Sequence, residues 1–297
     1  MRVDVAFNAG GVTLRGWLYK PDRGTGPFPL VVMAHGFSAL KEMGLDAYAE
    51  VFTAAGLAAL VYDNRNLGAS DGEPRFEIDP VAQMRDYQHA ISYAETYEEV
   101  DKGRIGIWGT SYSGGLVLMV AALDRRVKCV ASQVPFISGY ANMMQVTALE
   151  NRDQYYRTLE DERRSLYLGN PPSITSVCTD DPSKPIDAPG RRTYSYFQSH
   201  TKAKKLNWEN KVTVRSLDLR LAFEAMPFIE RIAPTPLLMI VADNDKITPT
   251  DISLQAFASA LEPKKLVLVH GDHYVPYLEE FELSSGAARD WFVDHLS

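Results

Sequence analysis

The 297-residue chain has few cysteines, no long hydrophobic run and no excess of positive charge. Only two cysteines occur: Cys129 lies in an apolar run and Cys178 in a polar, proline-rich stretch. This low usage predicts reduced thiols and a cytoplasmic location, although the sequence leaves a single disulfide open. The first residues lack the apolar core of a secretory signal, and no apolar run reaches the roughly 18 residues that span a membrane. We therefore expect neither secretion nor membrane insertion.

The charge balance limits the classes of partner. Acidic residues number 38 and basic residues 31, which gives a formal net charge of −7. Such a chain is repelled by nucleic acid and by anionic membranes, so we expect neither as a partner. Clustered Cys/His spacings and phosphate-cradling glycine loops are absent from the sequence, which therefore predicts no metal and no organic cofactor. The sequence allows a homodimer but does not decide the oligomeric state.

Short apolar runs alternate with segments of helical spacing along most of the chain. Runs typical of strands buried on both faces occur at 29–36, 57–63, 104–109, 127–133, 236–242 and 265–271. Helical spacing occurs at 45–55, 80–99, 115–123, 252–261 and 279–296. Two further strand-like segments, 3–7 and 12–19, predict an antiparallel hairpin at one edge. Together these patterns predict an α/β protein with a mostly parallel, doubly wound sheet of eight strands.

Residues 139–222 interrupt this alternation. They show no strong strand pattern, but they contain charged stretches, several aromatics and, at 169–190, a segment rich in Pro, Gly, Ser and Thr. An interval this long inside a compact domain is typical of an insertion with its own role. We therefore predict a mainly helical lid at 139–222, inserted between two parts of the core, 1–138 and 223–297.

The segment RIGIWGTSYSGG, residues 104–115, carries the first chemical signal. An apolar strand leads through a turn of small residues, which holds Ser111 and Ser113, into an apolar helix. This is the context of the nucleophile elbow G-x-S-x-G, although Ser113 stands where its second glycine belongs. Because Ser113 falls in the first turn of the helix, we predict Ser111 as the nucleophile. The alternative is an ordinary helix N-cap without chemistry.

A serine nucleophile needs a histidine to take its proton and a carboxylate to hold that histidine. One strand after the predicted lid ends in DND, and we predict Asp245 rather than Asp243 as the acid because Asp245 lies past the strand end. The last strand leads into HGDH, where His273 on the turn is preferred to His270 in the strand. The chain order Ser, Asp, His is the one expected for an elbow of this kind.

Acyl transfer also needs backbone N–H donors for the developing oxyanion. We predict that Tyr112, directly after the nucleophile, supplies one of them. The second is expected from the turn after the strand at 29–36, where Phe37 is preferred and Ser38 is the alternative. His35 is then a structural turn histidine.

Together these motifs resemble the α/β-hydrolases over essentially the whole chain. The resemblance rests on HGF at 35–37, YDNRNLGASDG at 62–72, GTSYSGG at 109–115, DNDKITP at 243–249 and HGDHYVPY at 270–277. The loop at 62–72 is similar to that of the dienelactone-hydrolase-like branch. NKVTVRSLDL, with FIERIAPTPLLMIVADND after it, resembles the fumagillin-type polyketide transferases and thiohydrolases and their bacterial relatives. The resemblance implies an α/β-hydrolase fold and the roles of nucleophile, acid and base for Ser111, Asp245 and His273.

The predicted chemistry is the cleavage of a moderately hydrophobic ester, lactone or thioester through an acyl-enzyme, with a small acyl compound as the partner. An acyltransferase with the same triad and a non-catalytic ligand-binding protein are the alternatives. A prolyl peptidase is a weaker alternative, because this length leaves no room for a propeller or an extra β-domain. Four apolar side chains are expected to line the acyl pocket, unless they form the core of the lid itself: Met143, Met144, Phe223 and Met226.

Overall fold

The structure is a computed structural model, and it describes residues 1–178 and 190–296. Within these residues one main sheet contains eight strands: β1 (Arg2–Ala9), β2 (Val12–Tyr19), β3 (Phe28–Ala34), β4 (Ala58–Tyr62), β5 (Val100–Thr110), β6 (Val127–Gln133), β9 (Leu237–Ala242) and β10 (Lys264–Val269). Their order is β1-β2-β4-β3-β5-β6-β9-β10. The neighbours from β4 to β10 are parallel, whereas β2 is antiparallel to both β1 and β4. The predicted eight-stranded, mostly parallel sheet with a hairpin at its edge is confirmed.

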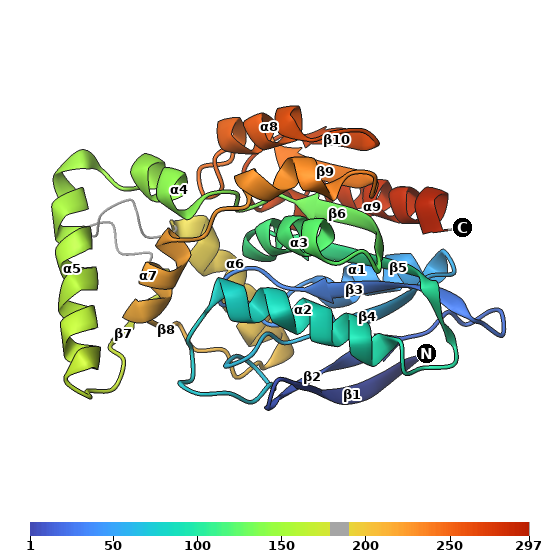
Figure 1. Cartoon of the computed structure of the whole chain (residues 1–297), viewed down its shortest axis with the longest axis horizontal. Coiled ribbons are helices and arrows are strands. Elements are labelled where there is room, and N and C mark those ends of the chain that lie inside the picture. The colour runs from blue at the N-terminus through green and yellow to red at the C-terminus, as the bar shows by residue number, and fades with distance from the viewer. Residues whose placement is uncertain (179–189, 297) are drawn as a thin grey trace.

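Helices cover both faces of this sheet (Figure 1). One face packs against α1 (Leu45–Ala54) and α9 (Phe281–Leu296). The other face packs against α2 (Pro80–Ala94), α3 (Tyr112–Leu123) and α8 (Thr250–Ser259). Two short 3₁₀ helices, η1 (Met226–Ile232) and η2 (Val275–Tyr277), lie in the connections of the second half. Buried side chains on both faces of the sheet explain why its strands are almost continuously apolar.

The helix α2 begins as its sequence predicts but ends earlier. Asp79 accepts hydrogen bonds from the N–H groups of Val81 and Ala82, and Pro80 occupies the first helical position. The expected helix over 80–99 stops at Ala94, because the next residues form a turn that leads into β5. β5 therefore begins at Val100, four residues before the predicted strand.

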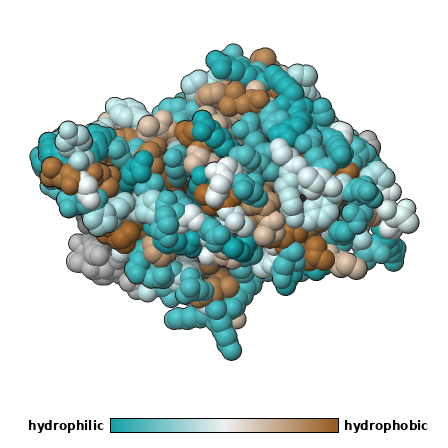
Figure 2. Space-filling model, turned by 60° about the horizontal axis from the view of Figure 1, so that its bottom comes forward, coloured by the Kyte–Doolittle hydropathy of each residue, from teal (hydrophilic) through white to brown (hydrophobic). Residues whose placement is uncertain are grey.

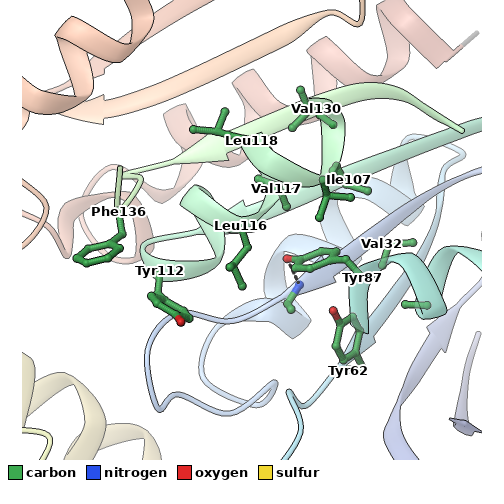
Figure 3. Close-up of a cluster of buried hydrophobic side chains, with 14 of the residues drawn as sticks. Val32, Tyr62, Tyr87, Ile107, Tyr112, Leu116, Val117, Leu118, Val130 and Phe136 are labelled. Carbon is green, nitrogen blue, oxygen red and sulfur yellow. Dashed lines mark hydrogen bonds between the residues drawn. The ribbon is translucent and has the colours of Figure 1, made fainter. Parts of the chain in front are cut away.

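The Tyr87 hydroxyl joins α2 to the two central strands (Figure 3). It accepts the Ala34 N–H at 3.0 Å and donates to the Trp108 carbonyl at 3.1 Å. These bonds fix the carboxyl end of β3 beside that of β5. The cluster drawn in Figure 3 continues from Tyr87 through Leu116 to Tyr112 and Phe136, so the core extends up to the edge of the sheet where the predicted site residues lie.

The expected lid region is mainly helical where it is described. It contains α4 (Gly139–Val146), α5 (Leu149–Tyr167), α6 (Arg191–Lys204), α7 (Val214–Leu221) and a ribbon of β7 (Ile174–Thr175) and β8 (Val212–Thr213). Part of the segment at 169–190, residues 179–189, lies outside the described residues. In Figure 1 α5 stands apart from the sheet, with α4 and α7 between it and the core. The domain boundaries at 139 and 222 remain a prediction.

The lid is tied to the core by α6 and by the segment after it. The Tyr196 hydroxyl donates to the Met43 carbonyl, and the Trp208 indole N–H donates to the Ser38 carbonyl, both at 2.8 Å. On the face seen in Figure 2, apolar side chains are scattered among hydrophilic ones. None of the described helices is both long enough and apolar enough to cross a membrane.

Candidate active site

Ser111 lies on the turn between the end of β5 and the start of α3. Its backbone has φ 55° and ψ −119°, a conformation that residues other than glycine adopt only when the surrounding structure enforces it. Its N–H donates to the Gln133 carbonyl at 2.8 Å, and its own carbonyl accepts the Phe136 N–H at 2.9 Å. The end of β6 and the loop after it therefore hold this strained turn in place.

Close backbone contacts explain the small residues around Ser111. A Cβ on Gly109 would lie 2.2 Å from the Ser113 carbonyl oxygen, and a Cβ on Gly115 would lie 1.9 Å from the Phe136 carbonyl oxygen. Ser113 is fully buried, and its hydroxyl donates to the backbone carbonyl of His35. The serine that replaces the second glycine of the pattern thus connects α3 to the turn after β3.

Ser111, His273 and Asp245 form a chain of hydrogen bonds. His273 Nε2 lies 2.9 Å from Ser111 Oγ, and His273 Nδ1 lies 2.7 Å from Asp245 Oδ2. Because the carboxylate accepts at Nδ1, the hydrogen bonding assigns the proton to Nδ1 and leaves Nε2 to accept from the serine hydroxyl. Asp243 and His270, the two residues set aside in the sequence, pair with each other on the surface at 2.8 Å.

The surroundings of Asp245 keep it ionised. Its Oδ1 accepts the N–H groups of Ile247 and Thr248 at 2.8 and 2.9 Å. Burial by itself would raise the pKa of the Asp245 carboxyl, but the electrostatic attraction and hydrogen bond of His273, together with the two backbone hydrogen bonds, outweigh burial and lower the pKa below its ordinary value. A charged carboxylate is what stabilises a neighbouring imidazolium.

Thr248 is a site residue that the sequence analysis did not identify. Its hydroxyl lies 2.8 Å from Asp245 Oδ2, 3.0 Å from the Val134 carbonyl oxygen and 3.2 Å from His273 Nδ1. One sequence feature could have identified it. Thr248 lies in DNDKITP three residues after Asp245, a position whose backbone an aspartate side chain commonly binds in a turn.

Two backbone N–H groups are available beside Ser111. Phe37 follows β3 and Tyr112 begins α3, and their rings pack edge to face with centroids 5.5 Å apart. Among the described residues, neither N–H has a hydrogen-bond partner. A Cβ on Gly36 would lie 3.0 Å from the Ser111 Cβ, so the glycine lets this turn approach the serine. Phe37 lines the adjacent cavity, and Ser38 is not among its lining residues.

A cavity of about 930 Å³ opens beside Ser111, a volume typical of sites for small molecules. Its wall is formed by the turns after β3, β5 and β9 on the core side and by α4, α6 and α7 on the lid side. Aromatic side chains are prominent in this wall: Phe37, Tyr112, Phe136, Tyr155, Tyr196, Phe197, Tyr274 and Tyr277.

The four side chains predicted to line the acyl pocket do not all line the cavity. Met143 lines the cavity. Phe223 is buried and stacks on Phe136 with ring centroids 5.8 Å apart, so it supports the wall from behind. Met144 and Met226 are not among the lining residues of this described cavity. The side chains that face the cavity depend on how the lid docks, which a sequence pattern does not indicate.

Three buried ionisable residues near this edge stabilise the backbone of its turns. His35 is buried, and its Nε2 accepts the Asn64 N–H at 3.2 Å. The buried Lys41 ammonium and Asp63 carboxylate pair at 2.7 Å, which connects the turn after β3 to the loop at 62–72. Within 1–178 and 190–296, no three His, Cys, Asp or Glu side chains are grouped as metal ligands would be.

Comparison with known proteins places the chain in a family. A family model described as X-Pro dipeptidyl-peptidase (S15 family) matches residues 10–275. The chain belongs to the S15 family. A thiohydrolase of Eupenicillium brefeldianum is 34% identical to this S15 protein, and the match covers 93% of the S15 protein described here and 88% of the thiohydrolase. The acyltransferase drtE of Aspergillus calidoustus is 30% identical over 91% of the chain and 86% of the relative.

A solved structure confirms the fold of this S15 protein. The crystal structure of the alpha/beta hydrolase GrgF from Penicillium sp. sh18 matches with a TM-score of 0.85 and 27% identity, and the match covers 100% of this chain and 99% of GrgF. The α/β-hydrolase fold and the resemblance to thiohydrolases and polyketide transferases, both predicted from sequence motifs, are therefore confirmed.

Proposed function

We propose that this α/β-hydrolase is a serine hydrolase that cleaves moderately hydrophobic esters, lactones or thioesters through an acyl-enzyme. The observation that carries the proposal is the hydrogen-bond chain from Asp245 through His273 to Ser111, at the wall of a 930 Å³ cavity rich in aromatic side chains. The names of the thiohydrolase and acyltransferase relatives support chemistry on acyl groups. The low cysteine content supports a cytoplasmic site of action.

In the proposed first step, Ser111 Oγ forms a bond to the substrate carbonyl carbon while His273 Nε2 accepts the hydroxyl proton. The carbonyl oxygen becomes an oxyanion that accepts from the N–H groups of Phe37 and Tyr112. Asp245 stabilises the imidazolium. The bond from carbon to the leaving oxygen or sulfur then breaks, and His273 returns the proton to the leaving group.

Deacylation repeats these events with water. His273 takes a proton from water, the resulting hydroxide attacks the acyl carbon, and the carbon bond to Ser111 Oγ breaks with return of that proton to the serine. The acid product leaves, and the starting state is restored. In an acyltransferase an alcohol or amine replaces this water, and the printed name of drtE keeps that alternative open.

Intact-mass trapping across a panel of esters, lactones and acyl thioesters, with an Xaa-Pro dipeptide anilide included, tests the proposal. We expect a mass increase equal to the acyl group, located on Ser111, and a fluorophosphonate probe should label the same residue. Ser111→Ala should abolish both and lower turnover about 10⁴-fold or more. Ser259→Ala, which alters an exposed serine at the end of α8, is the matched control.

Two other results would change the function. Substantial acylated product in the presence of added alcohols or amines, at the expense of free acid, would identify an acyltransferase. Failure of the fluorophosphonate to label Ser111 in folded protein would favour a non-catalytic ligand-binding protein.

A further inference from the structure

The charged side chains that line the cavity differ in their surroundings. Asp243, Lys246 and Asp251 are exposed, and Asp245 is hydrogen-bonded to His273. Arg220 is half-buried and reaches the cavity from α7, near the end of the lid sequence. It lies over the ring of Phe37, whose N–H is a proposed oxyanion donor.

Arg220 has no charged partner among the described residues. Neither an ion pair nor a side-chain hydrogen bond of its guanidinium occurs within 1–178 and 190–296. The guanidinium instead lies over the face of the Phe37 ring, whose centroid is 5.1 Å from the Arg220 Cζ. Arg215, on the same helix, is instead paired with Glu77 at 3.2 Å. A half-buried guanidinium that has no carboxylate partner in the described part of the chain has lost some hydration, which a ligand with anionic oxygens would replace.

A second polar group without a partner lies next to it. The Tyr112 hydroxyl is buried with no hydrogen-bond partner among the described residues, and Tyr112 lines the same cavity. The Phe37 ring contacts both side chains, so the three residues form one corner of the wall. Buried polar groups are normally hydrogen-bonded, so the polar atoms of this corner are under-satisfied within the described residues, and of the two side chains Arg220 is the one that is partly exposed.

We propose that Arg220 binds an anionic oxygen group of the substrate, such as a carboxylate or a phosphate, and so selects substrates that carry such a group over neutral ones of similar size. This inference rests on the proposed hydrolase function and specifies its substrate class. A planar guanidinium suits either group, because its donors match carboxylate and phosphate oxygens in pairs. The anionic group has two chemical sources, the far end of the acyl chain or the leaving group of a phosphopantetheine thioester.

Matched substrate pairs distinguish the two sources. The acyl pair is the N-acetylcysteamine thioesters of adipic and hexanoic acid, which differ by a terminal carboxylate. The leaving-group pair is S-hexanoyl-4′-phosphopantetheine and S-hexanoylpantetheine, which differ by the phosphate. In one pair we expect the wild-type kcat/KM for the charged member to exceed that for the neutral member about ten- to hundredfold, the effect of a charge-assisted hydrogen bond. Arg220→Gln should bring that ratio close to one, whereas Arg215→Gln should leave it unchanged.

A binding measurement makes the test independent of turnover. Calorimetry on the Ser111→Ala protein should show tighter binding of the charged member of one pair, and Arg220→Gln added to that protein should remove the difference. Ratios near one for wild-type protein in both pairs would overturn the inference. An equal loss of kcat/KM for both members of a pair in Arg220→Gln would also overturn it, because Arg220 would then only position Phe37. Absence of turnover and of Ser111 labelling would overturn the proposed function, and the calorimetry would still decide the role of Arg220.

Discussion

Ser113 shows how one hydroxyl compensates for a departure from a sequence pattern. A glycine at this position would leave the His35 carbonyl without the partner that the Ser113 hydroxyl now supplies. The bond joins the first turn of α3 to the segment that carries Phe37, on which the proposed oxyanion site depends. A buried acceptor without a partner is costly, which makes Ser113 a structural residue close to the chemistry.

Ser113→Ala therefore has a defined expected cost. Loss of the hydroxyl leaves a buried carbonyl unsatisfied and should lower the free energy of unfolding by about 1–3 kcal/mol. Denaturant unfolding measures this, with the exposed Ser259→Ala as the control. We also expect a lower kcat on a neutral ester at nearly unchanged KM, because the turn that holds Phe37 loosens. Unchanged stability and kinetics would show that the hydroxyl is dispensable.

The residues that sequence reasoning found and those it missed differ in a physical way. Ser111, Asp245 and His273 each follow a strand, so their approximate meeting place is fixed by the parallel sheet. Thr248 follows Asp245 by three residues, but its contacts with Val134 and His273 are made across the fold, as is the contact of Arg220 with Phe37. Phe223 was predicted at the cavity because it is apolar and near the lid, but the same property suits a core residue, and it stacks behind Phe136.

At the scale of elements, the junction of β5 and α3 depends on backbone proximity. Gly115 faces the Phe136 carbonyl so closely that a methyl group has no space. Gly286 in α9 is the opposite case, since an added Cβ would meet only the end of the Arg289 side chain, 3.7 Å away. Gly115 is therefore required by a close backbone contact, whereas Gly286 is not.

Gly115→Ala and Gly286→Ala should consequently change stability in opposite directions. The first should destabilise the protein by more than about 2 kcal/mol and disturb the elbow, because the strand-helix junction must open. The second should stabilise it by about 0.5–1 kcal/mol, the helix preference of alanine over glycine. Thermal unfolding of both variants checks the pair. Equal effects would mean that the contact at Phe136 is not a constraint.

At the scale of the whole molecule, the buried His35 couples stability to pH. Burial lowers the pKa of its imidazole, and the nearby Asp63 opposes this only in part. An exposed histidine in the unfolded chain titrates near pH 6.5. Below about pH 6.5 the unfolded chain therefore binds a proton at this histidine that the native protein does not bind. The free energy of unfolding consequently decreases as the pH falls from about 6.5 to the lower pKa of the native protein.

We expect the wild-type Tm to fall between pH 7.5 and 5.5, and His35→Gln to show a smaller fall. Glutamine offers an acceptor and a donor at this position but does not titrate. Burial raises the pKa of Glu77 and Asp86, so protonation of these carboxyls favours the native protein as the pH falls, which is opposite to the effect of His35. This contribution is the same in the wild-type protein and in His35→Gln. The comparison of the two Tm profiles isolates the histidine. Parallel profiles would assign the pH dependence to other groups.

The sequence by itself determined how strands and helices of the core alternate along the chain, the mostly parallel type of the sheet and the three strand-end residues proposed as the triad. These follow from local spacing, because buried parallel strands are continuously apolar and their carboxyl ends meet at one edge. The sequence did not determine the end of α2, the wall of the cavity, the hydrogen-bond partners of Ser113 and Thr248, or the contact of Arg220 with Phe37. Those depend on how the lid and the turns dock against the sheet, which is decided by contacts between residues far apart in the chain.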